Sequence, residues 1–343
     1  MRKLLNTLYV SSQGSYLHQE GETVVVEKEK QKVLQLPIHT LGGIICFGNV
    51  LCSPFLLGFC AERDVAVSFL SEHGRFLASV QGPVRGNVFL RRQQYRMADN
   101  DEAIRKVAVQ VVSGKLANCR IVINRMVRDH SEKIDAAALR DTSSKIDRII
   151  DRLPHASRDS EIRGLEGQAA AEYFSVFNDL IIEQKKDFIF TERNRRPPLD
   201  EVNALLSFIY TLLAHDMRSA LETVGLDPAV GFLHRDRPGR PGLALDIMEE
   251  FRPVIADRLV LSLINRRQVN KKGFVKAASG AVVMNDDTRK IVLVEYQNRK
   301  QDQIYHPYIE ETVPIGLLFF VQANLMARYI RGDINGYPPF FWR

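Results

Sequence analysis

The chain changes its pattern of apolar and polar positions near residue 95. Before that point, short β-branched and aromatic runs such as "TVVVEKE", "GGIICFG" and "VAVSFLS" are separated by turn sequences such as "SSQG" and "QEGE". This alternation is typical of strands joined by turns. The segment "SPFLLGFCAERD" interrupts it and indicates a short helix capped by Ser53. The sequence therefore predicts a mainly β domain over residues 1–95.

Beyond residue 95 the apolar residues recur at helical spacing. In the segment 101–130 an apolar face has acids at its start and basic groups near its end. That face is formed by Ile104, Val107, Val111 and Val112. Further helical stretches are expected at 131–152, 160–183, 199–224, 243–267 and 312–331. The pattern predicts an α+β protein, in which the β domain precedes a larger all-helical domain over residues 96–343.

Composition narrows the class of protein. The length of 343 residues suggests about two domains, and a hydrophobic fraction of 45% is that of a globular chain. The four cysteines form no C-x-x-C pair and lie in apolar surroundings, so we expect buried free thiols. The N-terminus lacks the apolar core of a signal peptide, and no apolar run approaches the ~20 residues of a membrane span. We expect a cytoplasmic protein that does not enter a membrane.

A first candidate for chemistry is Glu166 in "RGLEGQAAAEYF". Gly164 and Gly167 flank it inside a predicted helix, where each glycine costs about 1 kcal/mol relative to alanine. Another backbone or a ligand that comes close would explain them. An acid between glycines is weak evidence by itself, and a solvated glutamate is the alternative.

A second candidate is His234 with the carboxylates that follow it. Asp246, Glu249 and Glu250 are spaced i, i+3 and i+4, which places them on one helical face, where like charges repel each other. Pro253 removes the N–H that would bond to the carbonyl of Glu249, so the helix should bend there. One imidazole with carboxylates suits Mn²⁺ and tolerates Mg²⁺. A solvated acidic helix start, with a structural histidine, is the alternative.

Basic residues lie on both sides of these acids, in a chain whose net charge is +6. Such runs are usually solvated faces, but several of them around an acid and histidine cluster favour a groove for a nucleic-acid backbone. The candidate DNA-binding residues are Lys185, Lys186, Arg193, Arg195, Arg196, Arg235, Arg237, Arg240, Arg266, Arg267, Lys271, Lys272 and Lys276. No short base-recognition signature appears, so binding should depend on shape and phosphate.

Several segments, in this order, resemble the CRISPR-associated endonuclease that acts as the integrase of spacer acquisition. They are "CFGNVLCSPFLLGFCAERDVAVSFLSEHGRF", "VFLRRQQY", "RGLEGQAAAEYF", "DEVNALLSFIYTLL", "VGFLH" and "LALDIMEEFRP". The tail "FVKAASGAVVMNDDTRK" followed by "YQNRKQ" looks most like the subtype I-C members. The resemblance spans nearly the whole chain. It depends on the order and spacing of the segments and not on any single motif.

The resemblance implies a homodimer formed by the β domain and a metal site in the helical domain. By the family's pattern, Glu166, His234 and Glu249 are the catalytic metal ligands for Mg²⁺ or Mn²⁺. Many relatives have aspartate where this chain has Glu249. Asp246 is expected to support a ligand or occasionally to bind the ion itself, and Glu250 has no counterpart. A small CRISPR adaptation protein is the implied partner in a heteromeric complex on double-stranded DNA.

The implied reaction joins a donor 3′-hydroxyl to a phosphodiester at the edge of a CRISPR repeat, and the family is also assigned metal-dependent DNA cleavage. Two other classes remain open. One is a non-catalytic basic DNA-binding scaffold whose acids form salt bridges with its arginines. The other is a metal-dependent nuclease unrelated to integration.

Overall fold

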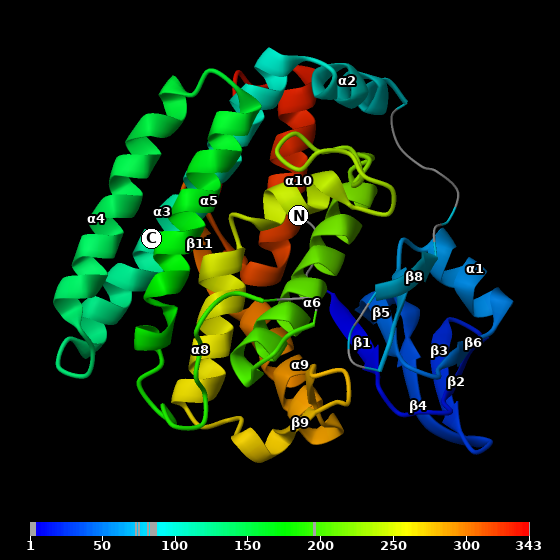
Figure 1. Ribbon diagram of the computed structural model, residues 1–343. Helices are drawn as coiled ribbons and strands as arrows, with labels where there is room; N and C mark the ends of the chain where they lie inside the picture. The colour runs from blue at the N-terminus through cyan, green and yellow to red at the C-terminus, as the bar shows by residue number, and fades with distance from the viewer. Residues whose placement is uncertain are drawn as a thin grey trace. The chain divides into compact units, whose positions relative to one another are not determined.

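The computed structural model describes residues 5–72, 74, 76–80, 82, 88–194 and 197–342. The chain folds into two compact units, residues 1–85 and residues 86–343 (Figure 1). The first unit is rich in strands and the second in helices, as the alternation of apolar positions predicts. Among the described residues, no helix is long and apolar enough to cross a membrane.

The N-terminal unit contains two four-stranded sheets, in the orders β1-β5-β7-β8 and β4-β3-β2-β6. In the first sheet β1, β5 and β7 are parallel and β8 is antiparallel to β7. In the second, β2, β3 and β4 are antiparallel neighbours, and β6 runs parallel to β2. The strands are β1 (Asn6–Val10), β2 (Tyr16–Glu20), β3 (Thr23–Lys28), β4 (Gln31–Pro37), β5 (Leu41–Phe47), β6 (Leu51–Cys52), β7 (Ala66–Leu70) and β8 (Phe76–Val80).

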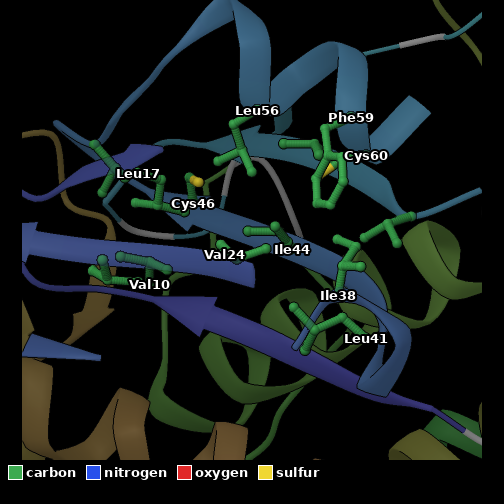
Figure 2. Packing of buried hydrophobic residues seen from close by; sticks show 14 residues of the cluster. Val10, Leu17, Val24, Ile38, Leu41, Ile44, Cys46, Leu56, Phe59 and Cys60 are labelled. Atoms are coloured by element: carbon green, nitrogen blue, oxygen red, sulfur yellow. The ribbon is translucent and has the colours of Figure 1, made fainter. Parts of the chain in front are cut away.

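Helix α1 (Pro54–Glu62) contributes to the core of this unit. The hydroxyl of Ser53 accepts a hydrogen bond from the N–H of Leu56 at 3.1 Å, which confirms the predicted cap. Figure 2 shows Leu56 and Phe59 of α1 among the buried side chains of the strands. The four cysteines are free, as expected; Cys46, Cys60 and Cys119 are buried and Cys52 is half-buried.

The second unit is built from longer helices. They are α2 (Val88–Ala98), α3 (Asp101–His130), α4 (Ala136–Arg152), α5 (Asp159–Ser175), α6 (Glu201–Thr223), α7 (Gly242–Met248), α8 (Arg258–Asn265), α9 (Asp286–Gln301) and α10 (Ile315–Arg331). Two small antiparallel hairpins lie between them: β9 (Phe274–Lys276) with β10 (Val282–Met284), and β11 (Gln303–His306) with β12 (Glu311–Pro314). The pattern of apolar positions predicts neither the hairpins nor α9.

Helix α2 belongs to the helical unit, so the two units divide about ten residues before the change of pattern at residue 95. Gln94 explains why. Its buried amide donates to the carbonyls of Asp227 and Val230 at 2.7 and 2.9 Å and accepts from the N–H of Asp227 at 2.9 Å. A buried amide with three partners holds α2 to the loop after α6.

The stretch predicted as one helix over 243–267 is interrupted at Glu249. Helix α7 ends at Met248, a π-helical segment covers Arg252–Asp257, and α8 follows. Pro253 lies in that segment, and its missing N–H leaves no ordinary helical bond to the carbonyl of Glu249. The bend gives Glu249 and Glu250 different surroundings, although they are adjacent in the chain.

Candidate metal centre

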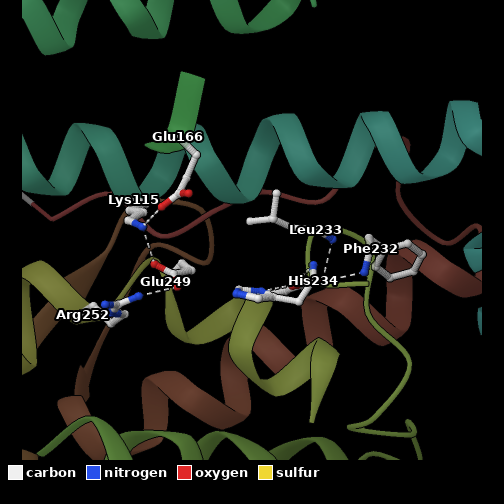
Figure 3. A network of polar contacts seen from close by, with 8 residues as sticks. Lys115, Glu166, Phe232, Leu233, His234, Glu249 and Arg252 are labelled. Atoms are coloured by element: carbon white, nitrogen blue, oxygen red, sulfur yellow. Dashed lines mark hydrogen bonds and ion pairs between the residues drawn. The ribbon is translucent and has the colours of Figure 1, made fainter. Parts of the chain in front are cut away.

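Glu166 and Glu249 meet at one lysine. Glu166 comes from the middle of α5, Glu249 follows the end of α7, and Lys115 reaches them from α3 (Figure 3). The Lys115 ammonium donates a hydrogen bond to Glu166 Oε1 and lies 2.7 Å from Glu249 Oε2. The side chains of Lys115 and Glu249 are 10% and 5% exposed, whereas that of Glu166 is 26% exposed. The cluster is therefore closed around Glu249 and opens to solvent beside Glu166.

A second cation holds the other oxygen of Glu249. Arg252 Nη1 donates to Glu249 Oε1 at 2.5 Å, and the guanidinium lies over the ring of Tyr210, 4.2 Å from its centroid. Burial by itself would raise the pKa of Glu249, but the charges of Arg252 and Lys115 outweigh it and lower that pKa. Burial likewise opposes the charged form of Lys115, and attraction from Glu249 and Glu166 raises its pKa in spite of that. The mutual attraction therefore favours the charged forms of Glu249, Lys115 and Arg252.

His234 is held by Asp246. The fully buried carboxylate of Asp246 accepts the backbone N–H groups of Phe232, Leu233 and His234 at 2.6, 3.0 and 2.9 Å. Its Oδ1 also lies 2.7 Å from His234 Nδ1. Gly231 makes this possible, because a Cβ there would come within 2.7 Å of Asp246 Oδ2. One aspartate on α7 thus shapes the whole "GFLH" turn.

This contact fixes the tautomer of the imidazole. An ionised carboxylate only accepts hydrogen bonds, so Nδ1 carries a proton and, in the neutral imidazole, Nε2 has the lone pair. In Figure 3 the ring of His234 is directed toward the side on which Glu249 lies. A carboxylate behind the imidazole is the usual support of a histidine that binds a metal ion through its other nitrogen.

The donor set suits a hard divalent cation, although the residues are not gathered as a closed ligand shell. Among the described residues, no three histidine, cysteine, aspartate or glutamate side chains are grouped closely enough to hold a metal ion. The Lys115 ammonium instead lies where Glu166 and Glu249 converge. A cation bound by two carboxylates shows that the position attracts positive charge, and with the free Nε2 of His234 the set matches Mg²⁺ or Mn²⁺.

The flank of α5 around Glu166 is open. A Cβ at Gly164 or Gly167 would meet nothing within 4 Å, so no backbone in the described part of this chain comes close to these two glycines. Of the two explanations that the sequence leaves open, another backbone or a ligand, the first finds no support among the described residues. A ligand that enters beside Glu166 remains a prediction that this opening favours.

Glu250 follows Glu249 in the turn after α7, and its side chain lies in a network of neutral groups. Its carboxyl accepts from the Tyr337 hydroxyl at 2.6 Å, the Phe340 N–H at 2.7 Å and the Gln322 amide at 2.9 Å. Burial raises the pKa of Glu250 to about 8 against these donors. The Asn118 amide, on α3, joins the carbonyls of Glu250 and Phe340 at 2.8 and 2.9 Å. Glu250 therefore ties the C-terminal segment to the turn that carries Glu249.

Lys115 is not among the candidate site residues predicted from the sequence. A signal was present: Lys115 falls among the buried positions of α3, four residues after Val111 and three before Asn118. A lysine on an inward helical face needs a buried anion as its partner. The pattern alone does not say which anion, because Glu166 and Glu249 lie 51 and 134 residues farther along the chain.

Most of the candidate DNA-binding side chains are exposed. These are Lys185, Lys186, Arg235, Arg237, Arg266, Arg267, Lys271, Lys272 and Lys276, and Arg240 is half-buried. Arg235 lies 3.4 Å from Asp159 at the start of α5, and Arg267 pairs with Glu183 at 2.9 Å. Arg195 and Arg196 lie outside the described residues.

Arg193 differs from the others. It is half-buried and donates to Asn203 Oδ1 at 2.6 Å and to Ser207 Oγ at 3.1 Å. Its guanidinium holds the loop before α6 to that helix, so its visible role is structural.

Comparison with known proteins places these features in a family. Residues 8–298 match the family model described as CRISPR associated protein Cas1. A CRISPR-associated endonuclease Cas1 of Chlorobaculum tepidum is 56% identical over 343 residues, the full length of both chains. A solved Cas1 structure from Thermotoga maritima superposes with a TM-score of 0.82 at 25% identity, over 95% of this chain and 97% of that one. A casposase bound to integration product shares the fold at 22% identity, with a TM-score of 0.84 over 97% of this chain and 93% of that one.

Proposed function

Since the chain belongs to the Cas1 family of CRISPR-associated proteins, we propose that it is a metal-dependent DNA endonuclease and integrase. In this proposal it joins a short donor duplex to a phosphodiester at the edge of a CRISPR repeat. The similarity to a named endonuclease over the whole length of both chains supports the enzymatic class, and the fold shared with a casposase bound to integration product agrees with strand transfer.

One observation carries the proposal. Two glutamates from separate helical segments converge on a single positive charge, and a histidine in the same region is oriented by a buried aspartate. A scaffold that needs only salt bridges has no use for a histidine whose Nε2 is left free. We propose that Glu166, Glu249 and Nε2 of His234 hold Mg²⁺ or Mn²⁺, while Asp246 supports His234.

Bound there, a divalent ion supplies a Lewis acid for a phosphoryl oxygen and lowers the pKa of an attacking hydroxyl or water. The chain's own residues prepare the site. Arg252 keeps Glu249 ionised and in place, and Asp246 engages Nδ1 of His234 so that its other ring nitrogen, Nε2, is the one available to an ion. Strand transfer forms one P–O bond to the donor 3′-oxygen and breaks one P–O bond of the repeat strand. Hydrolysis differs in that water is the nucleophile.

Exposed basic residues would hold the DNA backbone. Arg235 and Arg237 follow His234 directly, and Arg235 also lies beside Asp159 on α5, the helix that carries Glu166. Phosphate contacts at these positions would align the duplex with the ion. The homodimer, the small adaptation partner and the likeness to subtype I-C are further parts of the proposal, supported by the family resemblance.

An integration assay tests this function. It combines the purified protein, the adaptation partner, a donor duplex and a supercoiled plasmid that carries a repeat, with Mn²⁺ or Mg²⁺ and with EDTA. We expect metal-dependent insertion at the repeat edge. A protein that binds DNA without any metal-dependent activity would be a scaffold, and one that cuts DNA but inserts no donor would be a nuclease unrelated to integration. Either result contradicts the proposal.

A further inference from the structure

Lys115 has no role in the proposed reaction, yet it lies at the centre of the site. Its Nζ contacts Oε1 of Glu166 and Oε2 of Glu249, two of the oxygens that the proposed function assigns to the ion (Figure 3). Its side chain is only 10% exposed and projects from the inward face of α3. Solvation therefore does not account for this lysine.

The chemistry of an ammonium group suits a place between two carboxylates. It carries a compact positive charge, donates three hydrogen bonds and accepts none. Two carboxylates that faced each other without a cation would repel each other and lose hydration. Lys115 removes that penalty for Glu166 and Glu249. With Arg252, it balances the two negative charges of the glutamates.

We propose that Lys115 is the resident counter-cation of this site: it holds Glu166 and Glu249 together before an ion enters, and it competes with the ion for their oxygens. The inference rests on the proposed function, because it takes these two glutamates as the metal ligands. Lys115 is a positioning residue, and it sets how tightly the free protein binds the ion.

The contact with Glu249 is the one that opens more readily. Lys115 pairs with Glu249 Oε2 at 2.7 Å, and that oxygen has no other polar partner among the described residues. The contact with Glu166 Oε1 is a hydrogen bond. Glu249 also keeps Arg252 on its other oxygen when Oε2 is released, so it stays ionised and positioned. An entering ion would therefore displace the ammonium first from Glu249 Oε2.

Titration of the DNA-free, full-length protein with Mn²⁺ tests the inference. Binding is followed by the loss of the electron paramagnetic resonance signal of free Mn²⁺. We expect Lys115→Met to bind Mn²⁺ about 10- to 100-fold more tightly than the unsubstituted protein, within the range typical of coupling between two binding events. In EDTA the same variant should have a lower Tm than the unsubstituted protein, and added Mn²⁺ should raise its Tm by more.

Three further variants make the result specific. Lys115→Gln removes the charge but keeps hydrogen-bond donors, so it answers the same question if Lys115→Met does not fold. Lys115→Arg keeps the charge and should keep the low affinity for Mn²⁺. Lys106→Met, on the same helix, removes a lysine whose pairing with Glu102 is exposed, and it should change neither the affinity nor the Tm in EDTA.

The outcomes separate this inference from the proposed function. If Lys115→Met and Lys115→Gln bind Mn²⁺ no more tightly than the unsubstituted protein, the counter-cation role is overturned. Glu166→Gln and Glu249→Gln should each weaken Mn²⁺ binding strongly. If those two variants bind Mn²⁺ as the unsubstituted protein does, the metal site itself is misassigned, whatever the lysine variants show.

Discussion

Glu249 and Glu250 are adjacent and both buried, yet their surroundings have opposite effects on their pKa values. Glu249 faces Lys115 and Arg252, and these charges lower its pKa despite burial. Glu250 faces the Tyr337 hydroxyl, the Gln322 amide and the Phe340 N–H, and burial raises its pKa to about 8. At neutral pH one side chain is a carboxylate and the other is mainly a neutral acid.

The contrast shows that burial alone does not identify a functional acid. The neighbouring groups determine the role of each acid. Cations keep Glu249 charged and able to bind an ion, whereas neutral donors let Glu250 hold the C-terminal segment in place. The interrupted helix separates the two, because the end of α7 and the π-helical segment point successive side chains to different sides.

The largest expected effect is a difference in strand-transfer activity between variants of the two glutamates. Glu249→Gln should lower strand transfer by on the order of 1,000-fold, since it removes the charge that holds the ion. Glu250→Gln replaces a mainly neutral acid with a neutral amide of the same shape, and the Tyr337 hydroxyl can reverse to accept from it. It should keep most of the activity at pH 7, measured in the integration assay.

Circular dichroism of both variants is the control, because Glu249→Gln also leaves Lys115 and Arg252 with less compensation. Equal loss of activity in two folded variants would remove the functional distinction between the adjacent acids.

The second effect is a pH dependence of stability that belongs to Glu250. Its pKa is raised from 4.5 to about 8 in the folded protein, so the folded state binds more protons than the unfolded state between these values. The stabilisation is complete below pH 4.5 and is lost as the pH rises through about 8. Relative to Glu250→Gln, the unsubstituted protein should lose on the order of 5 kcal/mol across this window.

Urea unfolding at a series of pH values measures the difference. Parallel stability curves for the two proteins would show that Glu250 has the same pKa in the folded and unfolded states.

A smaller effect tests how the C-terminal segment is fastened beside Glu250. Asn118→Ala removes the amide that bridges the carbonyls of Glu250 and Phe340 and the oxygen that accepts from the Trp342 N–H. Buried backbone groups without partners should cost about 2 kcal/mol of stability. Limited proteolysis should then cut the C-terminal segment faster. An unchanged cleavage rate and stability would mean that Asn118 does not fasten it.

The smallest effect concerns positive charge outside the cluster. Lys271 and Lys272 are exposed, unlike Lys115. Charge reversal at both should weaken DNA binding. It should also reduce the slope of the logarithm of the binding constant against the logarithm of the salt concentration by about one for each lysine. Binding to a duplex at several salt concentrations measures the slope. Binding of equal strength and equal slope would place these lysines outside the DNA groove.

The sequence predicts the two-part architecture because that depends on local periodicity and caps, such as Ser53. It also singles out His234 with Asp246, Glu249 and Glu250, since they lie within sixteen residues of one another. It does not predict Lys115 between Glu166 and Glu249, because three distant segments must pack before that contact exists. Helical spacing alone does not separate Glu249 from Glu250, because Tyr337 lies 87 residues away from Glu250. The family resemblance separates them, since it gives Glu250 no counterpart.

Anomalous diffraction from a crystal soaked in Mn²⁺ tests the central claim most directly. We expect a manganese peak bound by Glu166, Glu249 and Nε2 of His234, with the Lys115 ammonium moved off Glu249 Oε2. A map with no peak at these side chains, and with Lys115 still joining the two glutamates at saturating Mn²⁺, would contradict it.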